Sequence, residues 1–420
     1  MSNRSIVERD ARRTDLDWVR IGAIALLIFY HVGVFYAPGP TAVGAISPRP
    51  LPWLVIPMVL VNPWRLLVLF IVSGAATRFM SDKMSSEALL KSRSARLLIP
   101  LVFGILVVVP PQCFVQVVER CGYSGTYLQF WSRYLLADQH LCRAGPHLIV
   151  PTWNHLWFVA YLWVFTALLA LVLSAAPSVL TRLQHWLERV LSGWGLALWP
   201  ASWLALAWLF LEHRFPLSYA CAIYIPAFLF GFLTLKSDVI WIRMDGVRWR
   251  VLAGALLSYC SMIGLAFLVL GAHGGWGAQM VASHSGLRIL ELRTMGAAVY
   301  ALDQWLWILV VLGFARHYLS NRDGPIRRYL TDAIFPFYII HQTTIEVAGH
   351  YLAKAQLPLG IESTLLIGAT IASCFATYEI VRRIRLLRPL FGLKRLAPWR
   401  SISSPCDWLA ARAAARDDTA

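Results

Sequence analysis

The chain has 420 residues, of which 58% are hydrophobic and only 14% are charged, and its mean hydropathy is +0.59. This composition excludes an ordinary water-soluble domain and indicates a membrane protein with several spanning helices. The net charge of +16 does not indicate a nucleic-acid partner, because Arg and Lys gather in alternate short loops, as the positive-inside rule predicts.

Ten apolar segments follow one another along the chain. They predict an all-α, polytopic transmembrane bundle of about ten helices that lies in a lipid bilayer, with both termini in the cytoplasm. Residues 1–396 are expected to form one transmembrane domain and residues 397–420 a cytoplasmic tail. The predicted segments are 20–38, 54–79, 96–117, 153–175, 196–212, 219–236, 251–271, 297–318, 333–354 and 363–383.

The first segment begins at Arg20 and contains His31. Eleven helical steps make about three full turns, so the two side chains share one helix face and lie about 16 Å apart along the axis. Ionisable groups at membrane depth are costly and suggest a functional site. This face therefore offers an anion-binding group at the membrane edge and a candidate base within, although a lone histidine can also simply hydrogen-bond a neighbouring helix.

The second segment contains Arg65 and, further along, the step Ser73-Gly74. Arg65 and Ser73 are candidate donors to an oxyanion. Two plainer interpretations stay open: Arg65 as an interfacial anchor and Ser73-Gly74 as a site of close helix packing.

Two further polar clusters lie at or near membrane depth. Asn154, His155 and Trp157 lie at the outer mouth of the fourth segment, and Tyr338 and His341 lie three residues apart on one helix face. Helix capping and interface anchoring explain these residues individually. However, unrelated packing contacts rarely explain the presence of three histidines and two arginines in one bundle.

The predicted outer loop 118–152 is rich in Tyr, Trp and His. These aromatic residues are typical of a membrane interface and are also good surfaces for sugar rings. Cys121 and Cys142 lie in this loop and could form a disulfide.

Several phrases resemble those of one enzyme family. RIGAIALLIFYH is similar to the first-helix signature of the acyltransferase 3 family, membrane enzymes that O-acylate carbohydrates, and LVLFIVSGAATRF resembles its second-helix phrase. HLWFVAYLWVF, FPFYIIHQT and YEIVRRIRLLRPLFG resemble the glucan biosynthesis protein C branch more closely. The family often has Arg-x-x-x-Arg before the third helix, whereas this chain has Lys91, Arg93 and Arg96 there.

The resemblance implies a bacterial inner-membrane enzyme that moves an acyl group, such as acetyl or succinyl, from cytoplasmic acyl-CoA to a hydroxyl of a periplasmic or cell-envelope carbohydrate. Acyl-CoA is then a substrate, and no permanently bound cofactor or metal is expected. Arg20, Lys91, Arg93 and Arg96 would bind the CoA phosphates. His31 would act as the base with Arg65 and Ser73 at the oxyanion.

The acceptor would meet Asn154, His155, Trp157, Tyr338 and His341. The alternative function is a transporter or flippase for a lipid-linked sugar, with the histidines as proton relays. A site-free structural protein has little support. The acyl group, the acceptor, an acyl-histidine intermediate and the oligomeric state do not follow from the sequence.

Overall fold

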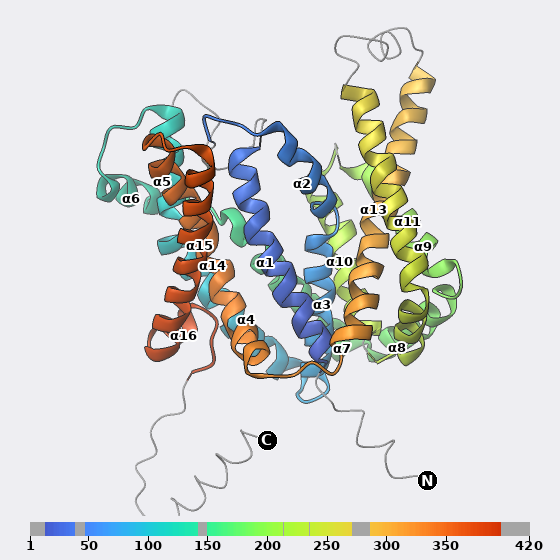
Figure 1. Ribbon diagram of the computed structural model, residues 1–420. Coiled ribbons are helices and arrows are strands. Elements are labelled where there is room, and N and C mark those ends of the chain that lie inside the picture. The colour runs from blue at the N-terminus through green and yellow to red at the C-terminus, as the bar shows by residue number, and fades with distance from the viewer. Residues whose placement is uncertain are drawn as a thin grey trace, which may run out of the picture.

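The computed structural model describes residues 13–37, 47–141, 149–212, 214–234, 236–270 and 286–395, with only the backbone described for 266–270 and 286–292. Every regular element in these ranges is a helix (Figure 1). The elements are α1 (Thr14–Tyr36), η2 (Pro52–Leu54), α2 (Val55–Val61), α3 (Arg65–Ser81), α4 (Ser86–Phe103), η3 (Gly104–Val108), α5 (Pro110–Cys121), α6 (Tyr127–Leu135), η4 (Asn154–Leu156), α7 (Trp157–Ala175), α8 (Pro177–Val190), α9 (Gly195–Leu211), α10 (Pro216–Thr234), α11 (Asp238–Leu270), α13 (Gly286–Leu319), α14 (Pro325–Lys354), α15 (Leu359–Arg383) and α16 (Leu387–Leu390).

The all-α, polytopic fold class is confirmed, and each of the ten predicted segments coincides with one helix or with two or three consecutive helices. By length and composition, seven helices in the described ranges can cross a membrane, or eight if α8 and α9, bent by 113°, count as one span. Helix α14 is not among them because polar residues such as His341, Gln342 and Glu346 lower its hydropathy. These polar residues are mostly buried against other helices, so α14 crosses the bundle through its interior.

The predicted outer loop 118–152 is not structureless. Helix α6 lies within it and begins with a capping box formed by Thr126 and Gln129. Phe130 and Tyr134 are fully buried in an aromatic cluster, which favours packing over sugar binding for these rings. Cys121 is disulfide-bonded. Cys142, its predicted partner, and the predicted tail 397–420 lie outside the described residues.

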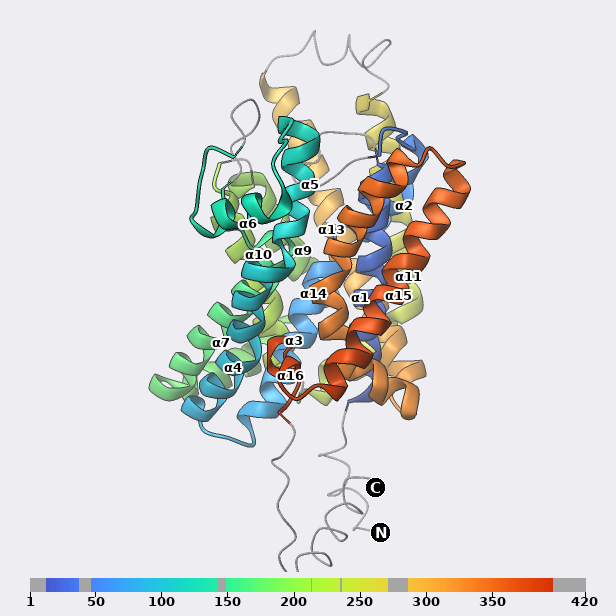
Figure 2. The ribbon, with the colours of Figure 1, turned by 90° about the vertical axis from the view of Figure 1, so that its left-hand side faces the viewer.

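The described turns that are rich in Arg and Lys, which the positive-inside rule predicts to face the cytoplasm, lie at one end of the bundle. Helix α1 begins there, the α3–α4 and α13–α14 turns lie there, and α8 crosses beneath α7 and α9 (Figures 1 and 2). These elements carry Lys83, Arg182, Arg189 and Arg322. We call this end the basic end and the other the far end.

Helix α3 packs unusually closely against α10. A Cβ atom at Gly74 would lie 1.9 Å from the carbonyl oxygen of Phe228, and one at Gly231 would lie 1.8 Å from that of Ile71. Only glycine permits this approach of two backbones. The second half of the Ser73-Gly74 step therefore serves helix packing.

Helices α1 and α14 lie side by side and run in the same direction (Figures 1 and 2). At the basic end, the buried Arg327 forms ion pairs with Asp17 of α1 and, at 2.7 Å, with Asp323. Hydrogen bonds from Arg327, and to a smaller extent from Arg328, hold the pKa of the Asp323 carboxyl below its ordinary value, so Asp323 stays ionised. Near the far end, the ring of Phe35 packs directly against Gly349.

We predict that Arg327→Met destabilises the protein in detergent by about 3 kcal/mol, because it leaves the Asp17 carboxylate without this buried partner. The neighbouring Arg328→Met is the matched control. Arg328 is 56% exposed and pairs with the same Asp323 at 3.2 Å, so its loss should change stability by less than about 1 kcal/mol.

The measurement is thermal unfolding followed by size-exclusion chromatography. Adding Asp17→Asn to Arg327→Met should recover part of the lost stability, because the charge that Arg327 neutralised is then removed. Equal unfolding temperatures for the Arg327 and Arg328 variants would contradict the assignment of Arg327 as the anchor between α1 and α14.

Candidate active site

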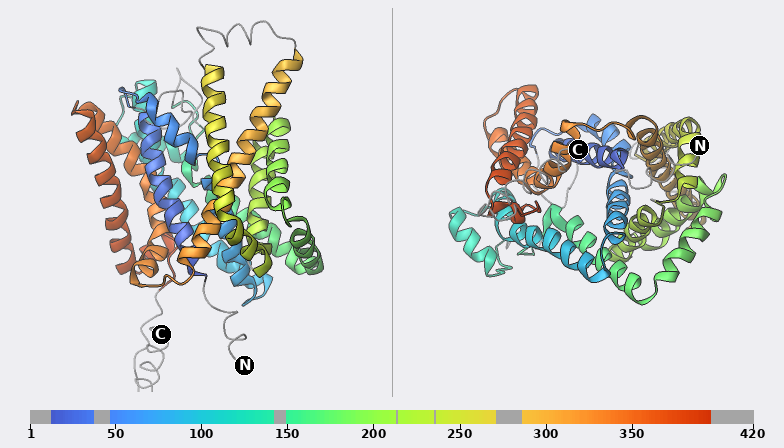
Figure 3. Two further views of the ribbon diagram at one scale, coloured as in Figure 1. Left: turned by 45° about the vertical axis from the view of Figure 1, so that its right-hand side comes forward. Right: turned by 90° about the horizontal axis from the view of Figure 1, so that it is seen from below.

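A cavity of about 580 Å³ opens at the basic end and extends into the bundle. Residues of α1, α3, α4 and α14 line it, and the view from that end shows how these four helices are arranged (Figure 3, right). Its walls near the opening carry six cationic side chains and two carboxylates. These are Arg13, Arg20, Lys83, Arg93, Arg96 and Lys394, and Asp17 and Asp332. We call this cavity the basic pocket.

The structure brings three of the four predicted donor-binding residues together in the basic pocket. Arg20 comes from α1, and Arg93 and Arg96 come from α4. Arg93 is fixed against α3 by hydrogen bonds to the Thr77 hydroxyl and, at 3.4 Å, to the Ser73 carbonyl oxygen. Lys91 is exposed on another face of α4 and does not line the pocket. An excess of guanidinium groups over carboxylates suits a ligand with several phosphates.

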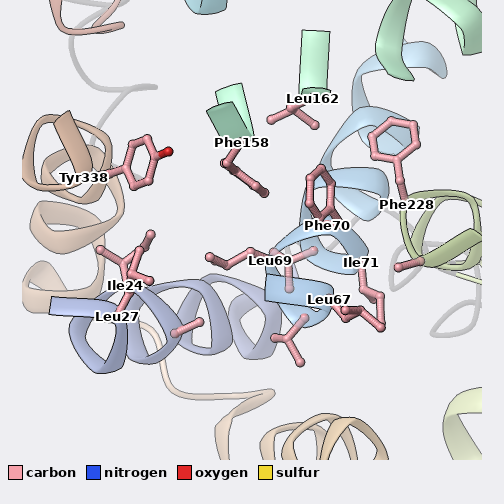
Figure 4. Close-up of a cluster of buried hydrophobic side chains, with 14 of the residues drawn as sticks. Ile24, Leu27, Leu67, Leu69, Phe70, Ile71, Phe158, Leu162, Phe228 and Tyr338 are labelled. Carbon is pink, nitrogen blue, oxygen red and sulfur yellow. The ribbon is translucent and has the colours of Figure 1, made fainter. Parts of the chain in front are cut away.

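The inner part of the basic pocket is apolar and ends at Tyr338. Ile24 of α1, Leu69 of α3, Phe158 of α7 and Tyr338 of α14 converge there (Figure 4). This lining suits an uncharged arm rather than the phosphates at the opening.

Three histidines from three helices meet next to Tyr338. The ring of His341 lies 5.4 Å from that of His31 and 5.3 Å from that of His155, measured between centroids. The Tyr338 ring lies 5.9 Å from His341 and 5.7 Å from His155. The candidate base and three of the five predicted acceptor residues therefore form one cluster.

A network of neutral hydrogen bonds holds His155 in this cluster. Its Nε2 donates to the Ile339 carbonyl oxygen at 3.0 Å, and its Nδ1 faces the Gln112 amide nitrogen at 3.4 Å. Gln112 also donates to the Thr343 hydroxyl at 2.6 Å and accepts a hydrogen bond from the Asn154 amide at 3.1 Å. Asn154 and His155 thus do more than cap a helix, because they connect η4 to α5 and α14.

Arg65 lies at the level of the histidines and is 6% exposed. Its guanidinium stacks on the Tyr30 ring at 3.4 Å and donates to the Asn62 side-chain oxygen at 2.6 Å. It also interacts electrostatically with His31. Arg65 is therefore not a snorkelling anchor, and it remains a candidate for stabilising negative charge beside His31.

Ser73 lies in the basic pocket, not beside Arg65. The eight residues between the two positions correspond to about 12 Å along α3. The two side chains cannot both donate to one oxyanion.

Trp157 lies apart from the other predicted acceptor residues. Its ring packs 5.4 Å from Tyr161 and 5.5 Å from Tyr224, and Phe70 lies 6.5 Å away. Tyr224 interacts electrostatically with Arg65, so this aromatic group borders the Arg65 side of the histidine cluster.

Sequence reasoning missed Gln112, Thr343 and Arg327. Each is buried, and each connects helices that are distant in sequence. Gln112 and Thr343 are polar residues inside apolar or amphipathic stretches, which is a usable signal for an intramembrane site. Nothing in the sequence pattern shows which partner each of them meets.

The chain belongs to the acyltransferase 3 family, described as an acyltransferase domain, which matches residues 13–379. The protein is therefore a membrane acyltransferase. No curated protein and no solved structure gives a significant match.

Proposed function

We propose that the protein transfers an acyl group from acyl-CoA, bound at the basic end, to a hydroxyl of a carbohydrate that reaches the histidine cluster from the far end. One observation carries this proposal: the basic pocket ends at Tyr338, whose ring contacts both His341 and His155. The cation-rich opening thus lies at one end of the pocket, and Tyr338, beside the histidine cluster that contains His31, lies at the other.

The donor half of the proposal follows from charge and distance. In this proposal Arg20, Arg93 and Arg96, which all line the basic pocket, bind the CoA phosphates. His31 lies about 16 Å further along α1 than Arg20. The pantetheine arm would cover this distance through the apolar section of the pocket, and its thioester would reach the histidine cluster.

The chemical step needs a base and a donor for the developing oxyanion. His31 accepts the proton of the attacking hydroxyl, the hydroxyl oxygen bonds to the acyl carbon, and the carbon–sulfur bond of the thioester breaks. The proton passes from His31 to the CoA sulfur, so that free CoA and an ester are the products. Arg65 stabilises the negative oxygen of the tetrahedral intermediate.

The acceptor half rests on the side chains near Arg65. Trp157, Tyr161 and Tyr224 offer ring faces to a sugar, and His31 and His155 are partly accessible whereas His341 is fully buried. A glycan of the cell envelope fits these features, with the basic end in the cytoplasm of a bacterium and the enzyme in its inner membrane. Acetyl and succinyl are the proposed acyl groups.

Mass spectrometry of envelope glycans from cells with and without the protein tests this function as a whole. Acetyl and succinyl esters differ in mass and charge, so one comparison identifies the donor and the acceptor together. Identical glycans in the two strains would contradict a carbohydrate acceptor.

The donor site generates its own prediction. The double substitution Arg93→Ala and Arg96→Ala should weaken CoA binding in detergent by at least about tenfold, because each charge-assisted hydrogen bond to phosphate contributes about 1.5–3 kcal/mol. Lys91→Ala is the matched control, since Lys91 shares α4 but lies outside the pocket. Calorimetric titration with CoA measures both, and an equal loss in the two proteins would remove the pocket as the donor site.

The base generates another prediction. His31→Gln should lower acyl transfer by about 10²- to 10⁴-fold while leaving CoA binding intact, because an amide keeps hydrogen bonds but cannot take a proton at neutral pH. Transfer is measured as release of free CoA in detergent and normalised to folded protein. Near-normal transfer by His31→Gln would show that His31 serves packing and not catalysis.

A further inference from the structure

The hydrogen bonds of His341 fix which of its ring nitrogens carries the proton. Its Nδ1 lies 2.7 Å from the Tyr338 carbonyl oxygen and 3.2 Å from that of Phe337. A carbonyl oxygen only accepts, so Nδ1 must be the N–H nitrogen. In a neutral imidazole, Nε2 then holds a free lone pair. Within the described part of the chain this Nε2 is buried and has no hydrogen-bond partner.

Three rings surround His341, and two of them are already engaged. His155 uses Nε2 toward the Ile339 carbonyl and Nδ1 toward Gln112, and the Tyr338 hydroxyl donates to the His155 carbonyl oxygen. The third ring is His31, for whose nitrogens no hydrogen bond is found to any described residue. His31 is therefore the available donor for the lone pair of His341.

The separation of the two rings fits such a bond. Two imidazoles joined by a straight N–H···N hydrogen bond of about 3 Å have centroids about 5.2 Å apart. The centroids of His31 and His341 are 5.4 Å apart, with 51° between the ring planes. Catalytic hydrogen bonds often tighten only when substrate binds.

We propose that His341 is the positioning residue for His31: its Nε2 accepts the N–H of His31 and thereby fixes the tautomer and orientation of the base. This inference rests on the proposed function. The arrangement is comparable to a catalytic triad, in which a third side chain orients the catalytic histidine, but here the orienting side chain, His341, is uncharged. The opposite nitrogen of His31 keeps its lone pair and faces the acceptor hydroxyl.

The proton balance of the reaction is unchanged by this arrangement. The free nitrogen of His31 takes the hydroxyl proton and returns it to the CoA sulfur. His341 keeps its own proton on Nδ1 throughout and only accepts the hydrogen bond from His31. His341 is 0% exposed, so it acts through His31 and does not touch the acceptor.

The test compares His341→Leu with His341→Gln. Leucine removes the acceptor, so kcat should fall by about 10²- to 10⁴-fold with unchanged KM for acyl-CoA, as expected when a base adopts the wrong tautomer. Glutamine supplies both an acceptor oxygen and an N–H donor, so it should retain at least about tenfold more activity than leucine. The control is His350→Gln, a buried histidine of the same helix paired with Glu119 at 2.5 Å, which should leave kcat unchanged.

A second readout does not depend on activity. In ¹⁵N-histidine-labelled protein, with His31 assigned by comparison with His31→Gln, the wild type should show one His31 tautomer and His341→Leu a mixture. An unchanged His31 spectrum in His341→Leu would overturn the pairing, as would equal losses of kcat in His341→Leu and His341→Gln. If the pairing holds in the spectra and the wild type transfers no acyl group, the proposed function fails and the histidine pair stands.

Discussion

The ion pair between Arg327 and Asp17 sets the register on which the candidate site depends. His31 lies fourteen positions after Asp17 in α1, and His341 lies fourteen positions after Arg327 in α14. Because the two helices run in the same direction, both histidines rise about 21 Å above the ion pair and meet at one level. A shift of either helix by one turn would separate the rings by about 5.4 Å along the axis.

Such a buried ion pair adds little net stability, because desolvation of both charges offsets most of their attraction. Its value here is specificity: an apolar contact between α1 and α14 tolerates several registers, whereas a buried guanidinium tolerates only those that bring a carboxylate to it. The pair of Arg327 with Asp17 therefore acts at one end of the helices and determines geometry at the other, where the chemistry is proposed to occur.

The sequence predicts the local features of this protein well and its contacts between helices poorly. The length of each apolar segment locates the membrane spans, and the helical period of about 3.6 residues places Arg20 and His31 on one helix face. Phase also explains why Lys91 misses the pocket, since two residues along a helix turn it about 200° away from Arg93. The pairing of Arg327 with Asp17 and that of Gln112 with Thr343 depend on how distant helices pack, which no local pattern contains.

The use of a histidine beside His31, where soluble hydrolases commonly place a carboxylate, follows from the environment. An ionised carboxylate at this depth would need a permanent partner, and Arg65 is the cation within electrostatic range of His31. A carboxylate there would attract the guanidinium and neutralise it before the reaction. In the proposed mechanism, neutral His341 orients the base without adding charge. Arg65 stacks on Tyr30 and donates to Asn62, both neutral, so it keeps its positive charge for the oxyanion that forms in the transition state.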